Sequence, residues 1–234
     1  MSRRSSVSLH PKSYKYGYIF GSSYYETTSP AIGSTSAADW YAAFYCRYSV
    51  NSVNNCALGN ITFPTGGFWF GISSAQLYSQ IVDSVGGLIS TGYTPATGHL
   101  GREIVALLSY TESDKTPRIY LNGYLVATGT PSGSSYQAHT SFLRIGTRPD
   151  VTYDWRTPQQ LFSVGGGSIS PTASQVLQHY ADTLVIGRIA PINAADHTWD
   201  LARYSSAPTS ISDTSSSPLT MTKSGTVATP IRWP

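Results

Sequence analysis

The stretch DWYAAFYCRY at residues 39–48 decides the fold of this chain. Read with a period of two residues, it divides into two sets of side chains: Trp40, Phe44, Cys46 and Tyr48 on one face, and Tyr41, Ala43 and Tyr45 on the other. Both sets are mostly apolar, so a strand formed here must be covered on both sides. The stretch therefore predicts a central strand of a β-sandwich.

Other short apolar runs lie on both sides of this strand along the chain, separated by Gly, Pro and Asn. They occupy residues 14–20, 68–72, 103–110, 118–127, 142–146 and 161–164. Within residues 118–127, Asn122-Gly123 stands between apolar strand formers and predicts a two-residue hairpin turn with positive φ angles. Strands that recur about every ten residues are typical of a sandwich or jelly roll.

One segment has a helical pattern. Ser170 can cap a helix, Pro171 suits its first position, and Val176, Leu177 and Tyr180 form one apolar stripe. We expect two or three turns here and strand or loop elsewhere. The predicted fold class is therefore all-β, a sandwich with one short helix.

Composition narrows the range of functions. Of 234 residues only 12% are charged, the formal net charge is +3, and there are 17 Tyr and 21 Gly. This composition excludes a coiled coil and a strongly basic nucleic-acid binder, so nucleic acid is not an expected partner. No apolar run approaches the roughly 18 residues of a membrane helix, and we expect no membrane span. Residues 1–10 lack the apolar segment of a signal peptide.

The expected organisation is one domain with two arms. Residues 1–20 form an N-terminal arm and first strand, and residues 21–206 form the sandwich. The Ser/Thr/Pro-rich residues 207–234 pack on the sandwich or on a neighbouring subunit, because Leu219, Met221 and Trp233 give them apolar anchors.

The two cysteines, Cys46 and Cys56, flank a turn-like segment at residues 49–55, and a hairpin there could bring them together. We favour two reduced, buried thiols, with a bridge across the hairpin as the alternative. No His or second cysteine pair stands at ligand spacing, so neither a metal nor a cofactor is expected.

Four segments together resemble the concanavalin A-like lectin/glucanase superfamily, especially its laminin G-like domains. Residues 103–129, which contain YLNGYLVA, resemble the paired strands of the family, and LRIG at 143–146 resembles the next strand. SPTASQVLQHY at 170–180 resembles the short closing helix, and residues 39–48 resemble an earlier aromatic strand. The resemblance covers about residues 38–182 and implies a β-sandwich of the jelly-roll type.

The chain departs from the family before the helix. Acidic residues common there are missing from residues 159–167, and the Asp ligands of calcium-binding members have no match residue by residue. The superfamily includes lectins, hydrolases, adhesion modules and virion proteins, so the fold does not fix the function.

Signals for catalysis are weak. Retaining glycosidases of this superfamily place acids as E-x-D-x-x-E, and Glu112-Ser-Asp114 begins that spacing, but Pro117 stands at the last acidic position. We expect a solvated turn there. The five histidines are scattered, and Gly165-Gly-Gly167 lacks the Lys and Ser/Thr of a phosphate loop, so it predicts a bend or bulge. The chain is not expected to be an enzyme.

Signals for binding are stronger. Sugar recognition uses an aromatic face and carboxylate or amide acceptors, and two polar-aromatic clusters have both. The candidate glycan contacts are Tyr153, Asp154, Trp155 and Arg156 in the first cluster, and Asp196, Trp199 and Asp200 in the second. A tryptophan tucked under a loop would have the same sequence pattern.

These observations lead to one hypothesis and two alternatives. We expect a non-enzymatic structural or adhesive module on the surface of an assembly, such as a bacteriophage decoration, spike or fibre protein that contacts a cell-surface glycan. Its partners would be further copies of itself or other virion subunits. The first alternative is a free-standing bacterial carbohydrate-binding module, cytoplasmic or exported by another route. The second is a glycoside hydrolase.

Overall fold

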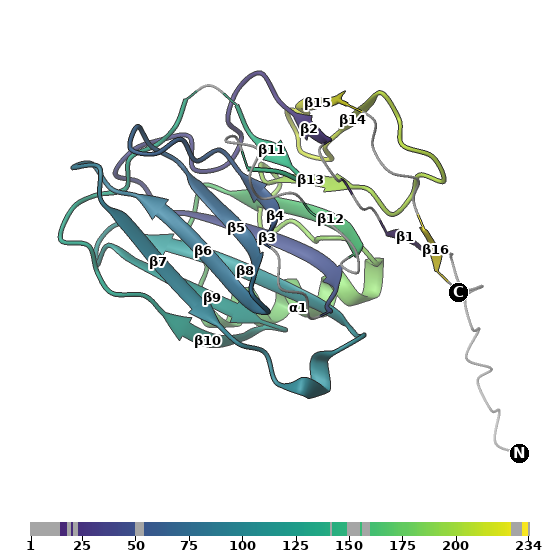
Figure 1. The fold of residues 1–234 in the computed structure, drawn as a ribbon, viewed down its shortest axis with the longest axis horizontal. Helices are drawn as coiled ribbons and strands as arrows, with labels where there is room; N and C mark the ends of the chain where they lie inside the picture. The colour runs from purple at the N-terminus through teal and green to yellow at the C-terminus, as the bar shows by residue number, and fades with distance from the viewer. Residues whose placement is uncertain are drawn as a thin grey trace, which may run out of the picture.

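The structure is a computed structural model that describes residues 15–17, 20, 23–49, 54–140, 142–148, 155, 160–225 and 231–233. Two antiparallel sheets lie face to face, and one helix lies against the outer side of one of them (Figure 1). The fold is an all-β, two-sheet sandwich with one α-helix among these residues, as the sequence predicts.

The six-stranded sheet has the order β10-β9-β8-β3-β12-β13. Its strands are β10 (Tyr124–Thr128), β9 (Thr116–Leu121), β8 (Glu103–Thr111), β3 (Trp40–Arg47), β12 (Gln160–Gly167) and β13 (His197–Asp200). Strand β3 therefore has β8 on one side and β12 on the other, which confirms its predicted central position.

The eight-stranded sheet has the order β14-β15-β2-β11-β4-β5-β6-β7. Its strands are β14 (Ser210–Ser212), β15 (Thr220–Ser224), β2 (Tyr24–Glu26), β11 (Arg144–Ile145), β4 (Asn55–Gly59), β5 (Phe68–Ser73), β6 (Gln76–Val82) and β7 (Leu88–Tyr93). A separate two-stranded pair joins β1 (Lys15–Gly17) to β16 (Ile231–Trp233), and a 3-10 turn, η1, spans Thr97–His99.

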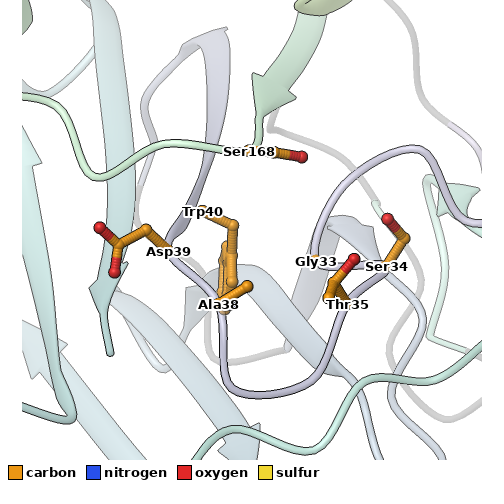
Figure 2. A pocket seen from close by; sticks show the side chains of 7 residues that line it. All are labelled: Gly33, Ser34, Thr35, Ala38, Asp39, Trp40 and Ser168. Carbon is orange, nitrogen blue, oxygen red and sulfur yellow. The ribbon is translucent and has the colours of Figure 1, made fainter. Parts of the chain in front are cut away.

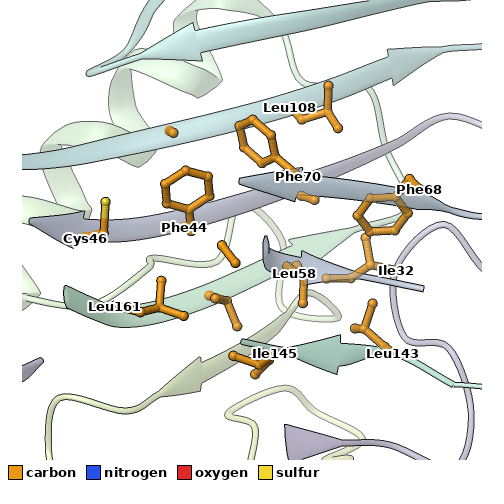
Figure 3. Packing of buried hydrophobic residues seen from close by; sticks show 14 of the residues in the cluster. Ile32, Phe44, Cys46, Leu58, Phe68, Phe70, Leu108, Leu143, Ile145 and Leu161 are labelled. Carbon is orange, nitrogen blue, oxygen red and sulfur yellow. The ribbon is translucent and has the colours of Figure 1, made fainter. Parts of the chain in front are cut away.

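Strand β3 is buried on both faces. One face packs against the eight-stranded sheet, where the Phe44 ring lies 4.8 Å from the Phe70 ring (Figure 3). The other face packs beneath helix α1 (Ala173–Ile186), where Tyr45 lies 5.1 Å from Phe162. The sandwich therefore has three layers, two sheets and a cover of helix and loop.

Helix α1 begins later and runs longer than predicted. Thr172, two residues beyond the expected cap Ser170, is the N-cap, and its side chain accepts a hydrogen bond from Gln175 N. The helix has 14 residues and ends at Gly187, whose φ is 74°. No helix among the described residues is long and apolar enough to cross a membrane.

The predicted hairpin turn is confirmed. Asn122 and Gly123 have φ angles of 51° and 87°, as a two-residue turn of this type requires. The Asn122 side chain also accepts a hydrogen bond from Val105 N at 3.0 Å, which joins the turn to strand β8.

The prediction of a bend at Gly165–Gly167 is wrong. All three residues lie inside β12, between β3 and β13. A Cβ at Gly166 would lie 2.3 Å from Tyr41 O, and a Cβ at Gly167 would lie 2.0 Å from Asp196 Oδ1. The run is glycine because neighbouring groups occupy the space of side chains, not because the backbone turns.

The alternative of a hairpin that brings the two cysteines together is wrong. Cys46 lies in β3 of the six-stranded sheet, whereas Cys56 lies in β4 of the eight-stranded sheet. Both are buried, reduced thiols, as favoured from the sequence. Burial raises the pKa of the Cys46 thiol well above its ordinary value.

Gly166→Ala tests the close approach within β12. Because the new methyl group would overlap a backbone oxygen, we expect the unfolding free energy to fall by about 1–3 kcal/mol. Urea denaturation measures this change. Gly98→Ala is the control, since nothing lies within 4 Å of its Cβ position, and it should change stability by less than about 0.5 kcal/mol. Equal effects of the two substitutions would contradict the packing argument.

His179 should make the stability of the fold depend on pH. Burial lowers its pKa to about 4, although the Ala190 carbonyl and Asp182 favour the charged form. The unfolded chain therefore takes up a proton first as pH falls below about 6.5, and stability is lost from there towards pH 4, by at most about 1.4 kcal/mol per pH unit.

Urea midpoints measured between pH 7.5 and 4.5 check this expectation. His179→Leu should flatten the dependence, whereas His99→Gln in the turn η1 should leave it unchanged. A slope that survives His179→Leu would show that other groups cause the dependence.

Candidate functional site

A small hollow opens at the end of the sandwich where β3 begins and β12 ends (Figure 2). Its volume is about 140 Å³. The lining residues come from the loop before β3, from the start of β3 and from the residue after β12: Gly33, Ser34, Thr35, Ala38, Asp39, Trp40 and Ser168. Since Tyr41 pairs with Gly167, the β3–β12 register brings Trp40 and Ser168 together.

Hydrogen bonds fix the loop that forms one wall of the hollow. The Tyr136 hydroxyl donates to Gly33 O at 2.7 Å, and Ala37 N donates to Tyr136 O at 3.1 Å. Gly33 has a φ of 59°, and a Cβ there would lie 2.8 Å from the Tyr136 hydroxyl oxygen. Burial raises the pKa of Tyr136, so its hydroxyl stays protonated and remains a donor.

Trp40 belongs to an aromatic cluster next to the hollow. Its ring lies 4.5 Å from Phe68, 5.3 Å from Tyr136 and 6.1 Å from Tyr110. The side chain is 1% exposed, and no described residue accepts a hydrogen bond from its Nε1. The N–H is enclosed by protein atoms, so Trp40 contributes packing next to the hollow.

Asp39 is the carboxylate of the hollow. Its Oδ1 accepts a hydrogen bond from Glu112 N at 2.7 Å, and the side chain is exposed. Glu112 in turn accepts from the Tyr110 hydroxyl at 3.1 Å. Burial, and then the charge of Glu112, raise the pKa of that hydroxyl. The carboxylate of Asp39 is thereby held in place by the turn that follows β8.

The hollow can bind a small polar molecule. Ser34, Thr35 and Ser168 supply hydroxyls that donate or accept, and Asp39 supplies an acceptor. Among its lining residues Asp39 is the one acid, and among the described residues no group of three or more His, Cys, Asp or Glu could hold a metal ion. The chemistry of the hollow is hydrogen bonding.

A second hollow of about 380 Å³ lies beside β7 and the loop after β10. Its lining includes Asp83, Ser90, Thr130 and Ser132 but has no aromatic ring. The Asp83 carboxylate already accepts hydrogen bonds from two backbone N–H groups of its own turn. The first hollow therefore has the more complete set of binding groups.

The first predicted glycan cluster lies largely outside the described residues, because Tyr153, Asp154 and Arg156 are not among them. Trp155 is described and is fully buried in the main core, with its ring 5.7 Å from Phe44. It packs between the sheets and does not present a ring face to solvent.

The second predicted cluster is also built into the fold. Asp196 is 3% exposed and accepts hydrogen bonds from the Tyr41 hydroxyl at 2.6 Å and from the backbone N–H groups of Ile192 and Asn193. Trp199 is fully buried and lies stacked 5.8 Å from His197. These contacts give both residues a structural role.

Asp200, at the end of β13, is half-buried. Burial raises the pKa of this carboxyl, and the charges of Arg188 and Arg203 partly offset that effect. Neither Trp155 nor any of Asp196, Trp199 and Asp200 lines the hollow at β3. Glycan contact by the predicted residues stays a prediction.

The acidic motif of residues 112–114 lies in a turn, as expected. Asp114 forms an ion pair with Arg118, and the hydrogen bond from that guanidinium is the main cause that lowers the Asp114 pKa. The motif therefore does not present two adjacent acids on a strand.

Sequence reasoning missed the residues of the hollow. Ser34, Thr35 and Asp39 stand in a loop of small polar residues, and Ser168 lies more than 120 positions away. One local signal was present, namely a carboxylate directly before the aromatic run that starts at Trp40.

No protein-family model matches the chain, and no curated protein matches it. Among solved structures, one described as "a putative carbohydrate binding protein from Bacteroides ovatus ATCC 8483" is similar over 94% of this chain, with a TM-score of 0.61 and 15% identity. The similarity covers 62% of that protein. It supports an all-β, two-sheet antiparallel sandwich, the fold class expected from the sequence.

A second similar structure is the binding domain of botulinum neurotoxin DC, in complex with SialylT. It matches 62% of this chain and 36% of its own, with 10% identity and a TM-score of 0.49. The chain thus spans less than two thirds of the length of either protein. Membership of the concanavalin A-like superfamily, and of its laminin G-like domains, stays a prediction.

Tyr136→Phe tests how the wall of the hollow is held. Removing the hydroxyl leaves the buried Gly33 carbonyl without its donor, so we expect a loss of about 1–3 kcal/mol in unfolding free energy, measured by urea denaturation. Tyr78→Phe is the control and should change stability little, because its ring lies on the other side of the eight-stranded sheet. An unchanged unfolding free energy in Tyr136→Phe would show that contacts other than this hydrogen bond hold the loop in place.

Proposed function

We propose that this protein is a non-catalytic carbohydrate-binding module that takes a sugar into the hollow at the start of β3. One observation carries the proposal: the hollow joins an exposed carboxylate, two hydroxyls on a loop that hydrogen bonds already fix and a third hydroxyl from the residue after β12. A ligand that meets a prearranged site loses less free energy to ordering of the protein.

The set of groups suits sugar hydroxyls. Each sugar hydroxyl both donates and accepts, and the lining offers a pure acceptor in Asp39 and hydroxyl groups that do both. At about 140 Å³ the hollow takes one sugar ring rather than a buried chain. We therefore propose recognition of a terminal sugar residue.

A binding role fits better than hydrolysis. Glycoside hydrolysis requires two carboxyl groups, about 5 Å apart in retaining enzymes and about 6.5–9.5 Å apart in inverting ones. The described lining of the hollow contributes one, Asp39. Further support is that the Bacteroides ovatus protein, which has a similar fold, is described as "a putative carbohydrate binding protein".

This proposal corresponds to the first alternative drawn from the sequence, a carbohydrate-binding module. The location on a virion or another assembly rests on the sequence alone and stays a prediction, as do the contacts of Tyr153, Asp154 and Arg156.

Asp39→Asn tests the proposal. A glycan array with the full chain identifies a bound sugar, and titration calorimetry then measures its affinity. Since hydrogen bonds to a charged group are worth about 1.5–3 kcal/mol, we expect Asp39→Asn to weaken binding about tenfold or more.

Asp182→Asn is the matched control, because it removes the same charge from an exposed carboxylate on helix α1. It should leave affinity unchanged. Failure of the full chain to bind any glycan would overturn the proposed function, and binding that survives Asp39→Asn would move the site elsewhere.

A further inference from the structure

The second hollow, beside β7, contains a carboxylate with one unused oxygen. Asp83 follows β6 directly, is 6% exposed and lines the hollow. Val85 N and Gly87 N both donate to its Oδ1, at 3.1 and 2.7 Å. No described residue donates to Oδ2, and this oxygen is not enclosed by protein atoms as the indole N–H of Trp40 is. Oδ2 is therefore an acceptor that opens into the hollow.

The charge of this carboxylate has no counter-charge among the described residues. None of their lysine, arginine or histidine side chains forms an ion pair with Asp83, which is also the one charged residue in the lining. Lys115 donates to Gly133 O at 3.2 Å, next to the loop on one side of the hollow, but it does not line the hollow. Since a buried charge without a counter-charge costs free energy, a cation that enters the hollow is stabilised there.

Gly87 keeps the unused oxygen open. A Cβ at this position would lie 2.8 Å from Oδ2 of Asp83 and 3.1 Å from its Oδ1. The backbone does not require glycine here, because the φ of Gly87 lies outside the left-handed region that the neighbouring Gly86 occupies with a φ of 79°. The missing side chain therefore leaves room beside the carboxylate.

Hydrogen bonds fix the backbone that carries Asp83. Asp83 N donates to Gly87 O at 3.0 Å within the turn, and Ser84 N donates to Ser135 O at 2.8 Å on the other side. Together with the two bonds to Oδ1, these contacts hold the carboxylate in one orientation. A cation that binds there meets a prearranged acceptor and loses less free energy to ordering of the protein.

The other groups of the hollow suit an ammonium ion on an aliphatic chain. Ser90 and Thr130 are exposed and supply hydroxyl oxygens, which accept hydrogen bonds. Leu88, Ile89 and Pro131 supply apolar walls. An alkylammonium packs its methylene groups along apolar surface while its N–H groups donate to polar atoms. The volume of about 380 Å³ leaves room for such a chain.

We infer that this hollow binds a primary alkylammonium group, the chemistry shared by a lysine side chain and a polyamine. The two backbone donors on Oδ1 decide between the possible cations. A guanidinium pairs best with both oxygens of a carboxylate, whereas an ammonium is a compact charge that one oxygen can bind. Calcium takes several oxygen ligands, commonly from more than one carboxylate, and Asp83 is the one acid of the lining. The inference is independent of the proposed function.

Titration of the full chain with n-butylammonium, followed by amide NMR spectra at constant ionic strength, tests the inference. We expect the Val85 and Gly87 resonances to shift, because both N–H groups donate to the carboxylate that the ammonium contacts. So small a ligand binds weakly, and the titration therefore extends to about 50 mM. The neutral analogue 1-butanol, which has the same number of heavy atoms, should leave both resonances unchanged.

Two variants locate the site. Asp83→Asn removes the charge but keeps an oxygen for Val85 N and Gly87 N, and we expect it to weaken binding about tenfold or more. Gly87→Ala should also weaken binding, because its methyl group takes the space beside Oδ2 while the charge stays the same. Asp182→Asn is the control, since it removes the same charge from an exposed carboxylate on helix α1, and it should leave the affinity unchanged.

The source of the ammonium is distinguished by comparing a Gly-Lys-Gly peptide, blocked at both ends, with spermidine. Tighter binding of the peptide assigns the hollow to a lysine side chain, and tighter binding of spermidine assigns it to a polyamine. Unmoved Val85 and Gly87 resonances, equal binding of 1-butanol, or unchanged affinity in Asp83→Asn would each overturn the inference. Tighter binding of calcium chloride at the same two resonances would also overturn it, because the hollow would then be a metal site.

Discussion

Strand β3 has no solvent face, and the rest of the structure depends on covering it. Its inward side chains require the eight-stranded sheet, and its outward side chains require helix α1 and the loop that leads to β13. Burial of apolar area is worth roughly 25 cal/mol per Å², so two large rings on each face of a single strand have a strong effect on the layer order. The same packing fixes the position of the site at the start of β3, since Trp40 belongs both to the strand and to the lining of the hollow.

The sequence predicts the elements with strong local patterns. The apolar runs that became β3, β5 and β8 and the Asn122-Gly123 turn were identified because burial on two faces and positive φ angles restrict residue choice. Strands β6 and β7 were not identified. They alternate short apolar and polar side chains near the edge of a sheet, and that pattern also occurs in loops. The pairing of β2 with β15 joins segments almost 200 residues apart, which no local pattern reports.

The candidate site was less predictable than the fold, for a physical reason. Clustering of aromatic and acidic residues in the sequence pointed to Trp155 and Asp196, but such residues also serve as core packing and as acceptors for loop N–H groups. The hollow instead combines Ser, Thr and Asp residues that have no distinctive sequence pattern. They come together only because β3 pairs with β12. Binding residues on loops are therefore easier to identify from the pairing of strands in the structure than from the composition of the sequence.

The two thiols have a use that follows from their places in the layers. Cys46 faces the space between the sheets, whereas Cys56 packs with Trp69 and Val82 on the far side of the eight-stranded sheet. Each reacts only when its own layer opens, because burial keeps the reagent out and holds Cys46 protonated. The unaltered chain thus contains two native reporters, whose rates of modification give separate opening free energies for the interior of the sandwich and for its outer surface.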